Sequence, residues 1–302
     1  MEDKSRPTLL LLAVTAVAPI TWGSTYYVTA THLPADRPLF AALVRALPFG
    51  LGLLLVRRRL PHGDWWWRAA VLGVINVGAF FALIFVAAYR LPGGLAATLT
   101  ATTPFVVALL AWALVKERPT PGAIGGAALG VVGVALLVLR AGFRVDPLGV
   151  AASLSAVLLF SVGIVLVKRW RPPVDMLTFT SWQLVAGGLA IAPVAILVEG
   201  APPTVDTAAV AGYLYIGLVG TVLAYAVWFL GIGRLPATAV ALVGLLNPVS
   251  GTVIGVSLAG EPFGPVQLVG TVLVISGITV GTVRRPVSAP PRVRPQLDEA
   301  MA

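Results

Sequence analysis

The chain has 302 residues, of which 58% are apolar and only 11% are charged, and its mean hydropathy is +0.94. A soluble domain has about 25% charged residues, so the composition excludes a water-soluble globular protein. The chain has no cysteine, which excludes disulfides and thiol chemistry. The net charge of +9 does not indicate a nucleic-acid partner, because the distribution of the basic residues follows membrane topology, as shown below.

Apolar stretches long enough to cross a bilayer recur along the whole chain. A spanning helix needs roughly 20 apolar residues. Backbone groups in lipid must be hydrogen-bonded within the segment, and these stretches are too long and continuous for barrel strands. The sequence therefore predicts an all-α membrane protein of ten transmembrane helices, at about residues 8–29, 38–56, 66–88, 93–114, 121–139, 147–168, 177–198, 207–230, 236–258 and 264–283.

The second predicted helix contains Arg45, the only charged side chain well inside a span. It lies about seven residues, or roughly 10 Å, from the outer end. Arg45 is either an anchor for a substrate carboxylate or a side chain that extends to the interface or pairs with helix carbonyls. Gln183 takes the same place in the seventh helix when the halves are aligned at an offset of 138 residues. It forms a hydrogen bond either with substrate or with the helix beside it.

The loop after the second helix combines Arg57-Arg58-Arg59 with Trp65-Trp66-Trp67. This pattern is typical of an aromatic belt at the headgroups, with the arginines on anionic lipid. A ligand-binding role is the alternative.

The second half of the chain repeats the first at an offset of 144 residues. Eleven of the 44 positions from 90 to 133 recur identically and without a gap, among them Arg90-Leu91-Pro92 as Arg234-Leu235-Pro236. We expect a first repeat over residues 1–141, a second over 146–285 and a disordered cytoplasmic tail over 286–302. An internal repeat in a membrane chain is typical of a transporter.

Prolines occur at matching places in the fourth and ninth helices, as Pro104 and Pro248. A proline inside a helix leaves the carbonyl four residues back without its donor, here Thr100 and Gly244. We expect a hinge beside a polar cavity, with simple packing as the alternative. Glu117 recurs at the 144 offset as Glu261, just before the next helix, whose dipole we expect it to neutralise.

The basic residues are distributed unevenly between the two sides of the membrane. With the N-terminus inside, sixteen Lys and Arg fall inside and four outside, and Arg45 lies within a span. This excess predicts that both termini are cytoplasmic. Five helices per repeat then make the two repeats inverted relative to each other, which suits alternating access.

The sequence lacks the residues that mark ion coupling within the membrane and the motifs that mark an enzyme. No Asp or Glu falls in the middle of a span, although such carboxylates are usual in proton relays and cation sites. The sequence has no Walker loop for ATP. We therefore expect no enzymatic activity, no metal and no cofactor.

Several of these features together resemble the EamA family of the drug/metabolite transporter superfamily. They are Trp22-Gly23-Ser24, Arg45, and the two stretches from Arg90-Leu91-Pro92 to Glu117 and from Arg234-Leu235-Pro236 to Glu261. The resemblance covers nearly all of residues 8–283. One departure is Phe160, where many members repeat a tryptophan.

The resemblance implies a central cavity lined by six of the ten helices. It would place near this cavity Trp22, Asn76, Phe81, Thr100, Tyr225 and Asn247. It also implies a multi-pass carrier of the bacterial inner membrane that exports a small-molecule substrate. Ten helices suffice for a pathway through a monomer, and the distribution of the basic residues indicates no nucleic-acid partner. Aromatic or other neutral amino acids are the expected substrates. Alternatives are a carrier for sugars or drugs and a membrane interaction protein without transport.

Overall fold

The computed structural model describes residues 5–35, 37–90, 93–138, 146–260 and 263–282. Over these ranges the chain is helical and forms no strand. Nine of the described helical segments are long and apolar enough to cross a membrane, and Pro121–Leu137 is a shorter apolar helix. They correspond one to one with the ten predicted helices, so the predicted fold class is confirmed.

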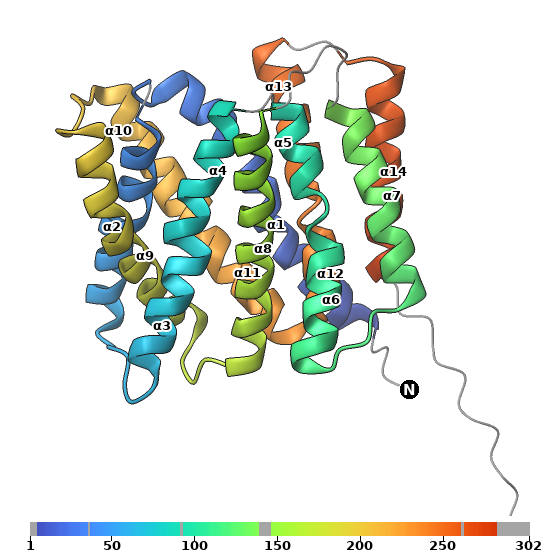
Figure 1. Cartoon of the computed structure of the whole chain (residues 1–302), viewed down its shortest axis with the longest axis horizontal. Helices are drawn as coiled ribbons and strands as arrows, with labels where there is room; N and C mark the ends of the chain where they lie inside the picture. Colours follow the sequence, from blue (N-terminus) through green and yellow to red (C-terminus); the bar gives the residue numbers. More distant parts are fainter. Residues whose placement is uncertain (1–4, 36, 91–92, 139–145, 261–262, 283–302) are drawn as a thin grey trace, which may run out of the picture.

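Several spans consist of consecutive labelled segments (Figure 1). The first half comprises α1 (Ser5–His32), α2 (Pro38–Arg57), α3 (Trp65–Gly73), η1 (Val74–Gly78), α4 (Ala79–Arg90), α5 (Gly93–Thr100), α6 (Thr103–Val115) and α7 (Pro121–Val138). The second half comprises α8 (Pro147–Trp170), α9 (Met176–Glu199), α10 (Thr207–Leu214), η2 (Tyr215–Leu223), α11 (Ala224–Arg234), α12 (Ala237–Val243), α13 (Leu246–Ala259) and α14 (Pro265–Thr282).

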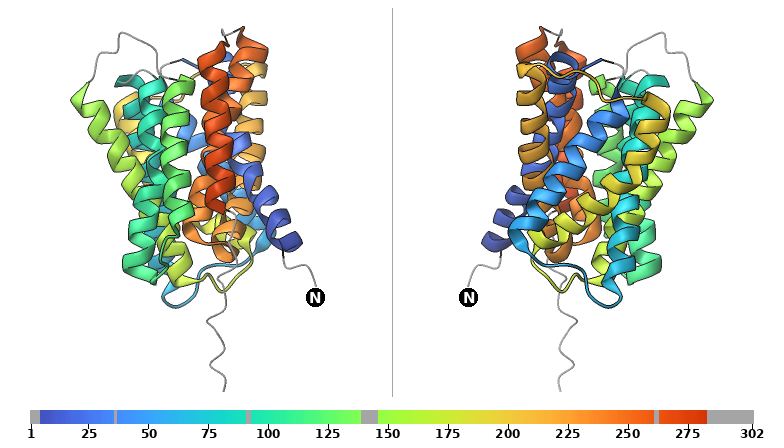
Figure 2. Two further views of the ribbon diagram at one scale, coloured as in Figure 1. Left: turned by 90° about the vertical axis from the view of Figure 1, so that its right-hand side faces the viewer. Right: turned by 90° about the vertical axis from the view of Figure 1, so that its left-hand side faces the viewer.

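The packing of the helices has two-fold pseudosymmetry. Helix α7 packs against its counterpart α14, and α2 packs against its counterpart α9. Helix α1 packs against α11 and α13, and its counterpart α8 packs against the matching α4 and α6. In Figure 1 the pair α7 and α14 stands at one edge of the molecule and the pair α2 and α9 at the other. The start of α1 and the end of α14 lie at the same end of the bundle (Figure 2).

Two spans contain a π-helical segment at matching places. Segment η1 interrupts the third span and η2 interrupts the eighth, and an offset of 144 residues places η1 within η2. A π-helix widens the turn and displaces a backbone hydrogen bond, and such segments occur frequently at functional sites. Both segments face the other half of the molecule, since η1 packs against α9 and η2 packs against α2.

Glycines bring α7 and α14 into close contact. A Cβ atom on Gly133 would lie 2.7 Å from the carbonyl oxygen of Gly270, and one on Gly270 would lie 2.6 Å from that of Gly133. The symmetric pair Gly126 and Gly277 approaches even more closely. Small residues let helix backbones approach in lipid, so these glycines account for the close packing of α7 with α14.

Helices that end on opposite sides of the bundle are capped by different residue types. At the end where α1 begins, α2, α6 and α8 are followed by basic residues in the left-handed conformation: Arg58 (φ 50°), Lys116 (φ 60°) and Arg171 (φ 49°). At the other end, α9 and α13 are followed by Gly200 and Gly260, also with positive φ. A non-glycine residue in this conformation costs about 1–2 kcal/mol.

Lys116 and Gly260 are an informative pair, because the 144 offset makes them the same position in the two repeats. Both adopt the left-handed conformation, but only the residue at the basic end has a charged side chain. A basic residue next to a helix C-terminus regains about 0.3–1 kcal/mol from the dipole. The strained positions therefore place positive charge on one face, as the positive-inside pattern predicts.

Three sequence expectations fall on residues outside these ranges. They concern the tail over 286–302, most of the link between the two predicted repeats, and the carboxylate of Glu261. The division of the chain into repeats at 1–141 and 146–285 stays a prediction.

Candidate functional site

Arg45 on α2 reaches across the centre of the molecule to η2 of the other half. Its Nε donates to the hydroxyl of Thr221 (3.1 Å) and its Nη2 to the carbonyl of Gly220 (3.3 Å). The guanidinium carbon lies 4.4 Å from the centroid of the Phe81 ring. Arg45 is only 8% exposed, so it does not extend to the interface. It pairs with a helix carbonyl, as one of the sequence alternatives proposed.

Gln183 on α9 makes the matching contact with η1. The amide nitrogen Nδ2 of Asn76 donates to Gln183 Oε1 (2.6 Å), and both side chains are buried. The backbone carbonyl of Asn76 accepts a hydrogen bond from the Tyr225 hydroxyl (3.2 Å). Gly163 on α8 lies so close that a Cβ there would overlap Asn76 Oδ1. Positions 45 and 183, which the sequence aligned, therefore each contact the π-helical segment of the opposite half.

A cluster of aromatic rings from α1, α4, α8 and α11 lies beside these contacts. This central aromatic cluster comprises Trp22, Phe80, Phe81, Phe160, Tyr225 and Trp228. The Trp22 ring lies 5.5 Å from that of Tyr225 and 5.1 Å from that of Trp228, between centroids. Its Nε1 donates to the carbonyl of Gly220 (3.0 Å), which also accepts from Arg45. Trp22 is half-buried, whereas Trp228 is fully buried.

Sequence reasoning missed three members of this cluster as site residues, namely Phe80, Phe160 and Trp228. Phe160 stacks on Phe80 at 4.9 Å and on Trp228 at 5.9 Å. One signal was available, because the 138 offset aligns Phe160 with Trp22, and the two rings meet at 6.4 Å. Aligned aromatics from inverted halves meet when both lie near the pseudo-two-fold axis.

Two buried N–H donors at this centre have no acceptor within the described part of the chain. They are Nε2 of Gln183 and Nε1 of Trp228. An unpaired polar group in an apolar interior costs several kcal/mol in lipid. Such groups are therefore candidates for donating to a ligand or to a different partner in another conformation.

The fourth span breaks between α5 and α6, next to Pro104. The Thr103 hydroxyl donates to the carbonyl of Thr100 (2.6 Å), and the Thr100 hydroxyl donates to the carbonyl of Ala97 (2.9 Å). The expectation that proline leaves the Thr100 carbonyl without a donor is therefore wrong, because a side chain replaces the lost amide. None of the hydrogen bonds or ring contacts of the described residues joins Thr100 to the central aromatic cluster.

The ninth span breaks at the matching place, between α12 and α13, next to Pro248. The carbonyl of Gly244 accepts a hydrogen bond from the backbone nitrogen of Asn247 (3.1 Å). This carbonyl is also paired, since the local turn tightens to a three-residue hydrogen bond. Asn247 approaches α1 closely, because a Cβ on Gly23 would lie 2.8 Å from its carbonyl oxygen. Asn247 therefore lies next to the helix segment that holds Trp22.

An ion pair joins the two halves at the end of the bundle where α6 and α8 finish. The Glu117 carboxylate pairs with Lys168 and accepts the backbone N–H of Ala237 (2.9 Å) at the start of α12. Lys168 also donates to the carbonyl of Leu235 (2.6 Å). We call these contacts the Glu117 latch. The expectation that Glu117 neutralises the dipole of the next helix is wrong, because the carboxylate caps α12 of the opposite half instead of α7.

Known proteins share this sequence and fold. The EamA-like transporter family matches residues 8–139 and 147–282. Protein PecM of Dickeya dadantii is 40% identical over 265 residues, which cover 87% of this chain and 89% of PecM. A probable amino-acid metabolite efflux pump of Salmonella typhimurium is 26% identical, over 86% of this chain and 91% of the pump. A protein of known crystal structure superposes with a TM-score of 0.77 at 22% identity, over 90% of this chain and 96% of its own.

The family match covers most of the chain, and the solved structure shares its fold. The ten described spans and their inverted packing agree with a transporter that is embedded in a lipid bilayer and moves a small-molecule substrate. The chain therefore belongs to the EamA-like transporter family of the drug/metabolite transporter superfamily, and it is a multi-pass membrane transporter, not an enzyme.

Proposed function

We propose that this transporter exports neutral amino acids, aromatic ones among them, or related small metabolites across the bacterial inner membrane. The substrate passes between the two repeats by alternating access, and the protein works as a monomer without a nucleic-acid partner. The efflux pump of Salmonella typhimurium, which is named for amino-acid metabolites, supports the substrate class. The absence of a carboxylate from the centre of any predicted span disfavours cationic substrates.

The observation behind this proposal is the pair of unpaired N–H donors at the centre of the molecule. Gln183 Nε2 and Trp228 Nε1 offer hydrogen bonds to an acceptor such as a carboxylate or carbonyl oxygen. Aromatic rings pack against Trp228, among them the half-buried ring of Trp22, and Asn76, the partner of Gln183, accepts a hydrogen bond from Tyr225. An apolar wall with a few polar groups that fix orientation is typical of a small-molecule site. A zwitterion with an apolar side chain matches both features.

The remaining predicted site residues have different roles in this proposal. Asn76, Phe81 and Tyr225 shape the wall of the site, and Arg45 holds η2 in place. The breaks at Pro104 and Pro248 act as hinges, and Thr100 and Asn247, which lie at these breaks, meet the substrate as the hinges move. Two broken spans at matching places let each half adopt the conformation of the other.

Counterflow in proteoliposomes tests the transport activity and its substrate class. The purified transporter is reconstituted without an ion gradient and given a panel of labelled amino acids. We expect saturable exchange of neutral amino acids, with the aromatic ones included. No exchange across the panel by folded protein would contradict the proposal and would favour other solutes or a non-transporting role.

A conservative substitution tests the site itself. Trp228→Phe keeps an aromatic ring and removes the unpaired N–H. If this group donates to substrate, we expect KM for counterflow to rise about fivefold or more, since a lost hydrogen bond is worth about 1 kcal/mol or more. No hydrogen bond within the protein is lost, so any fall in thermal stability should come only from the cavity that the smaller buried ring leaves. Trp112→Phe is the matched control, since Trp112 on α6 is 52% exposed on the outer surface of the bundle. An unchanged KM in Trp228→Phe would remove this residue from the substrate site.

A further inference from the structure

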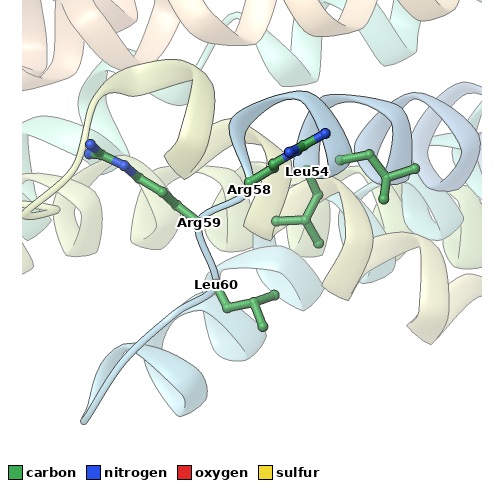
Figure 3. A pocket seen from close by; sticks show the side chains of 5 residues that line it. Leu54, Arg58, Arg59 and Leu60 are labelled. Atoms are coloured by element: carbon green, nitrogen blue, oxygen red, sulfur yellow. The ribbon is translucent and has the colours of Figure 1, made fainter.

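A hollow lies at the end of α2, outside the central site. It has a volume of about 410 Å³ and is lined by Leu54, Leu55, Arg58, Arg59 and Leu60 (Figure 3). Two of its leucines are strongly exposed, Leu55 at 74% and Leu60 at 59%. Apolar side chains of this kind at the end of a spanning helix lie at the boundary between the acyl chains and the headgroups.

The arginines around the hollow differ in their partners. Arg57 pairs with Asp175 (2.8 Å), and Arg68 pairs with Asp64 (2.9 Å). Arg58 and Arg59 lie between them in sequence, are exposed, and make no side-chain hydrogen bond or ion pair with any described residue. In Figure 3 their side chains extend to opposite sides of the loop. The hollow therefore has two free guanidinium groups at its rim.

The backbone that presents these arginines is held in place. Arg58 adopts the left-handed conformation and its N–H donates to the carbonyl of Leu54 (2.7 Å). The carbonyl of Arg59 accepts a hydrogen bond from Trp182 Nε1 (2.8 Å) on α9. The strain of a non-glycine residue at this φ is about 1–2 kcal/mol, and glycine would avoid it. As at the ends of α6 and α8, this position places a positive charge at the helix C-terminus, which the dipole favours.

We propose that this hollow binds an anionic phospholipid of the leaflet that meets the α2–α3 loop. The phosphate lies against Arg58, which extends on the side of Leu54, and an acyl chain runs along Leu54 and Leu55 of α2. Arg59, on the other side of the loop, adds to the positive charge that attracts the anionic headgroup. Arginine is well suited to phosphate, because its planar group offers several donors and is weakly hydrated. The exposed Trp66, close by at the start of α3, anchors the same region at the headgroups. The lipid then acts as a fixed point for the α2–α9 pair.

Lipid titration followed by native mass spectrometry tests this site. The full-length transporter in non-ionic detergent is titrated with phosphatidylglycerol or with phosphatidylcholine. We expect one phosphatidylglycerol to bind at least fivefold more tightly than phosphatidylcholine, since each basic residue near an anionic surface contributes about a fivefold preference. The double variant Arg58→Gln/Arg59→Gln should lose that preference.

The control removes two other arginines from the same face of the protein. Arg118 and Arg169 are exposed, so Arg118→Gln/Arg169→Gln changes the net charge equally. Binding within twofold of the unmodified protein is expected. Equal losses in the two double variants, or equal binding of the two lipids, would overturn the proposal. Inorganic phosphate in excess should not displace the lipid, and displacement would show that the site recognises phosphate alone.

A further variant separates lipid binding from folding. Arg58→Gly removes the charge and also relieves the left-handed strain, so the melting temperature should stay the same or rise. Phosphatidylglycerol binding should nevertheless weaken about fivefold. Binding that is unchanged in this stable variant and in the double variant would overturn the proposal.

Discussion

Arg45 and Gln183 take equivalent places in the two halves but hold their partners with different strength. The guanidinium of Arg45 donates two hydrogen bonds to η2 and lies over Phe81, whereas Gln183 accepts one amide hydrogen bond from Asn76. Charge-assisted hydrogen bonds are roughly twice as strong as neutral ones. The contact of α2 with η2 is therefore the stronger of the two, and the symmetric halves are energetically unequal.

Gly163 admits the Asn76 side chain, and its replacement gives a direct test of the η1 contact. In Gly163→Ala the new Cβ overlaps Asn76 Oδ1, so the amide must move and its hydrogen bond with Gln183 must weaken. We expect a loss of about 1–3 kcal/mol in stability and a clear fall in counterflow. Thermal unfolding in detergent and the transport rate are the measurements.

Gly52→Ala is the control for this change. A Cβ at Gly52, in the second half of α2, meets nothing within 4 Å. Alanine is the better helix former by about 1 kcal/mol in soluble helices, so this variant should be neutral or slightly stabilised. Equal behaviour of the two alanine variants would show that the contact of Gly163 with Asn76 has no energetic weight.

Among the structural elements, the start of α12 depends on the opposite half of the molecule. Its first turn has no capping side chain of its own, and Glu117 provides the acceptor from the end of the fourth span. The same carboxylate pairs with Lys168 at the end of α8. Separation of the repeats at this end must break these contacts, so the Glu117 latch stabilises the state that is closed here.

Weakening the latch should make this end of the bundle more accessible. Glu117→Gln keeps an acceptor for Ala237 but loses the ion pair, which is worth about 1 kcal/mol when partly exposed. Because the chain has no cysteine, Thr238→Cys, at a buried position of α12, provides a single reporter. We expect an impermeant maleimide to label it about fivefold faster in the Glu117→Gln background.

Asp64→Asn serves as the control for labelling. The Asp64–Arg68 ion pair lies within one half of the molecule and joins residues only four positions apart. The labelling rate should stay the same in that background. A rate that is also unchanged in Glu117→Gln would show that the latch does not control access to α12.

The pair α2 and α9 is fixed at both ends by carboxylates of α9. Glu199 caps α2 through the N–H groups of Leu39 (2.7 Å) and Phe40 (2.9 Å). At the other end Asp175 pairs with Arg57 and caps α9 itself. Although partial burial alone raises the pKa of Asp175, hydrogen bonds from Thr178 and Arg57 lower it to about 2.

This depressed pKa predicts a pH-dependent contribution to stability. The ordinary pKa is 3.8, so the stabilisation by ionised Asp175 is complete above about pH 4 and is lost as the pH falls towards 2. Asp175→Asn keeps a good N-cap but loses the ion pair. We expect it to be less stable by about 1 kcal/mol or less at pH 6, with the difference in melting temperature disappearing near pH 2. A difference that persists at pH 2 would contradict the assignment to this charge.

In the whole molecule, two pairs of equivalent helices pack against each other, α7 with α14 and α2 with α9. The central aromatic cluster lies between these two pairs. This arrangement distinguishes helix pairs that are held together from spans that are broken. The glycine contacts of α7 with α14 and the end caps of α2 with α9 are close and well paired, whereas the fourth and ninth spans are broken. In the proposed alternating access, the broken spans would move against the two fixed pairs.

The orientation of the whole bundle in the membrane is a separate prediction. Ala201→Cys and His62→Cys place single reporters in exposed loops on opposite sides. With both termini cytoplasmic, an impermeant maleimide added to intact cells should label the cysteine at position 201 and not the one at position 62. The opposite pattern would show that the basic residues at the ends of α2, α6 and α8 face outward.

Much of this architecture is specified locally and could therefore be predicted. A continuous apolar segment in lipid must form a helix, because lipid offers no hydrogen-bond partner to its backbone. This holds for any neighbouring segments. The recurrence of Arg90-Leu91-Pro92 and Pro104 at a fixed offset predicts paired halves and paired breaks, because the same sequence forms the same local structure.

The tertiary structure decided the partners of individual side chains. The sequence alone did not reveal that Arg45 contacts Gly220, that Glu117 caps α12, or that Phe160 joins the aromatic rings. Each of these contacts joins segments far apart in the chain. A charged or polar side chain could pair with many residues of the same chemical type. Its choice depends on which helix the fold brings within about 3 Å, and that distance is set by packing across the two halves.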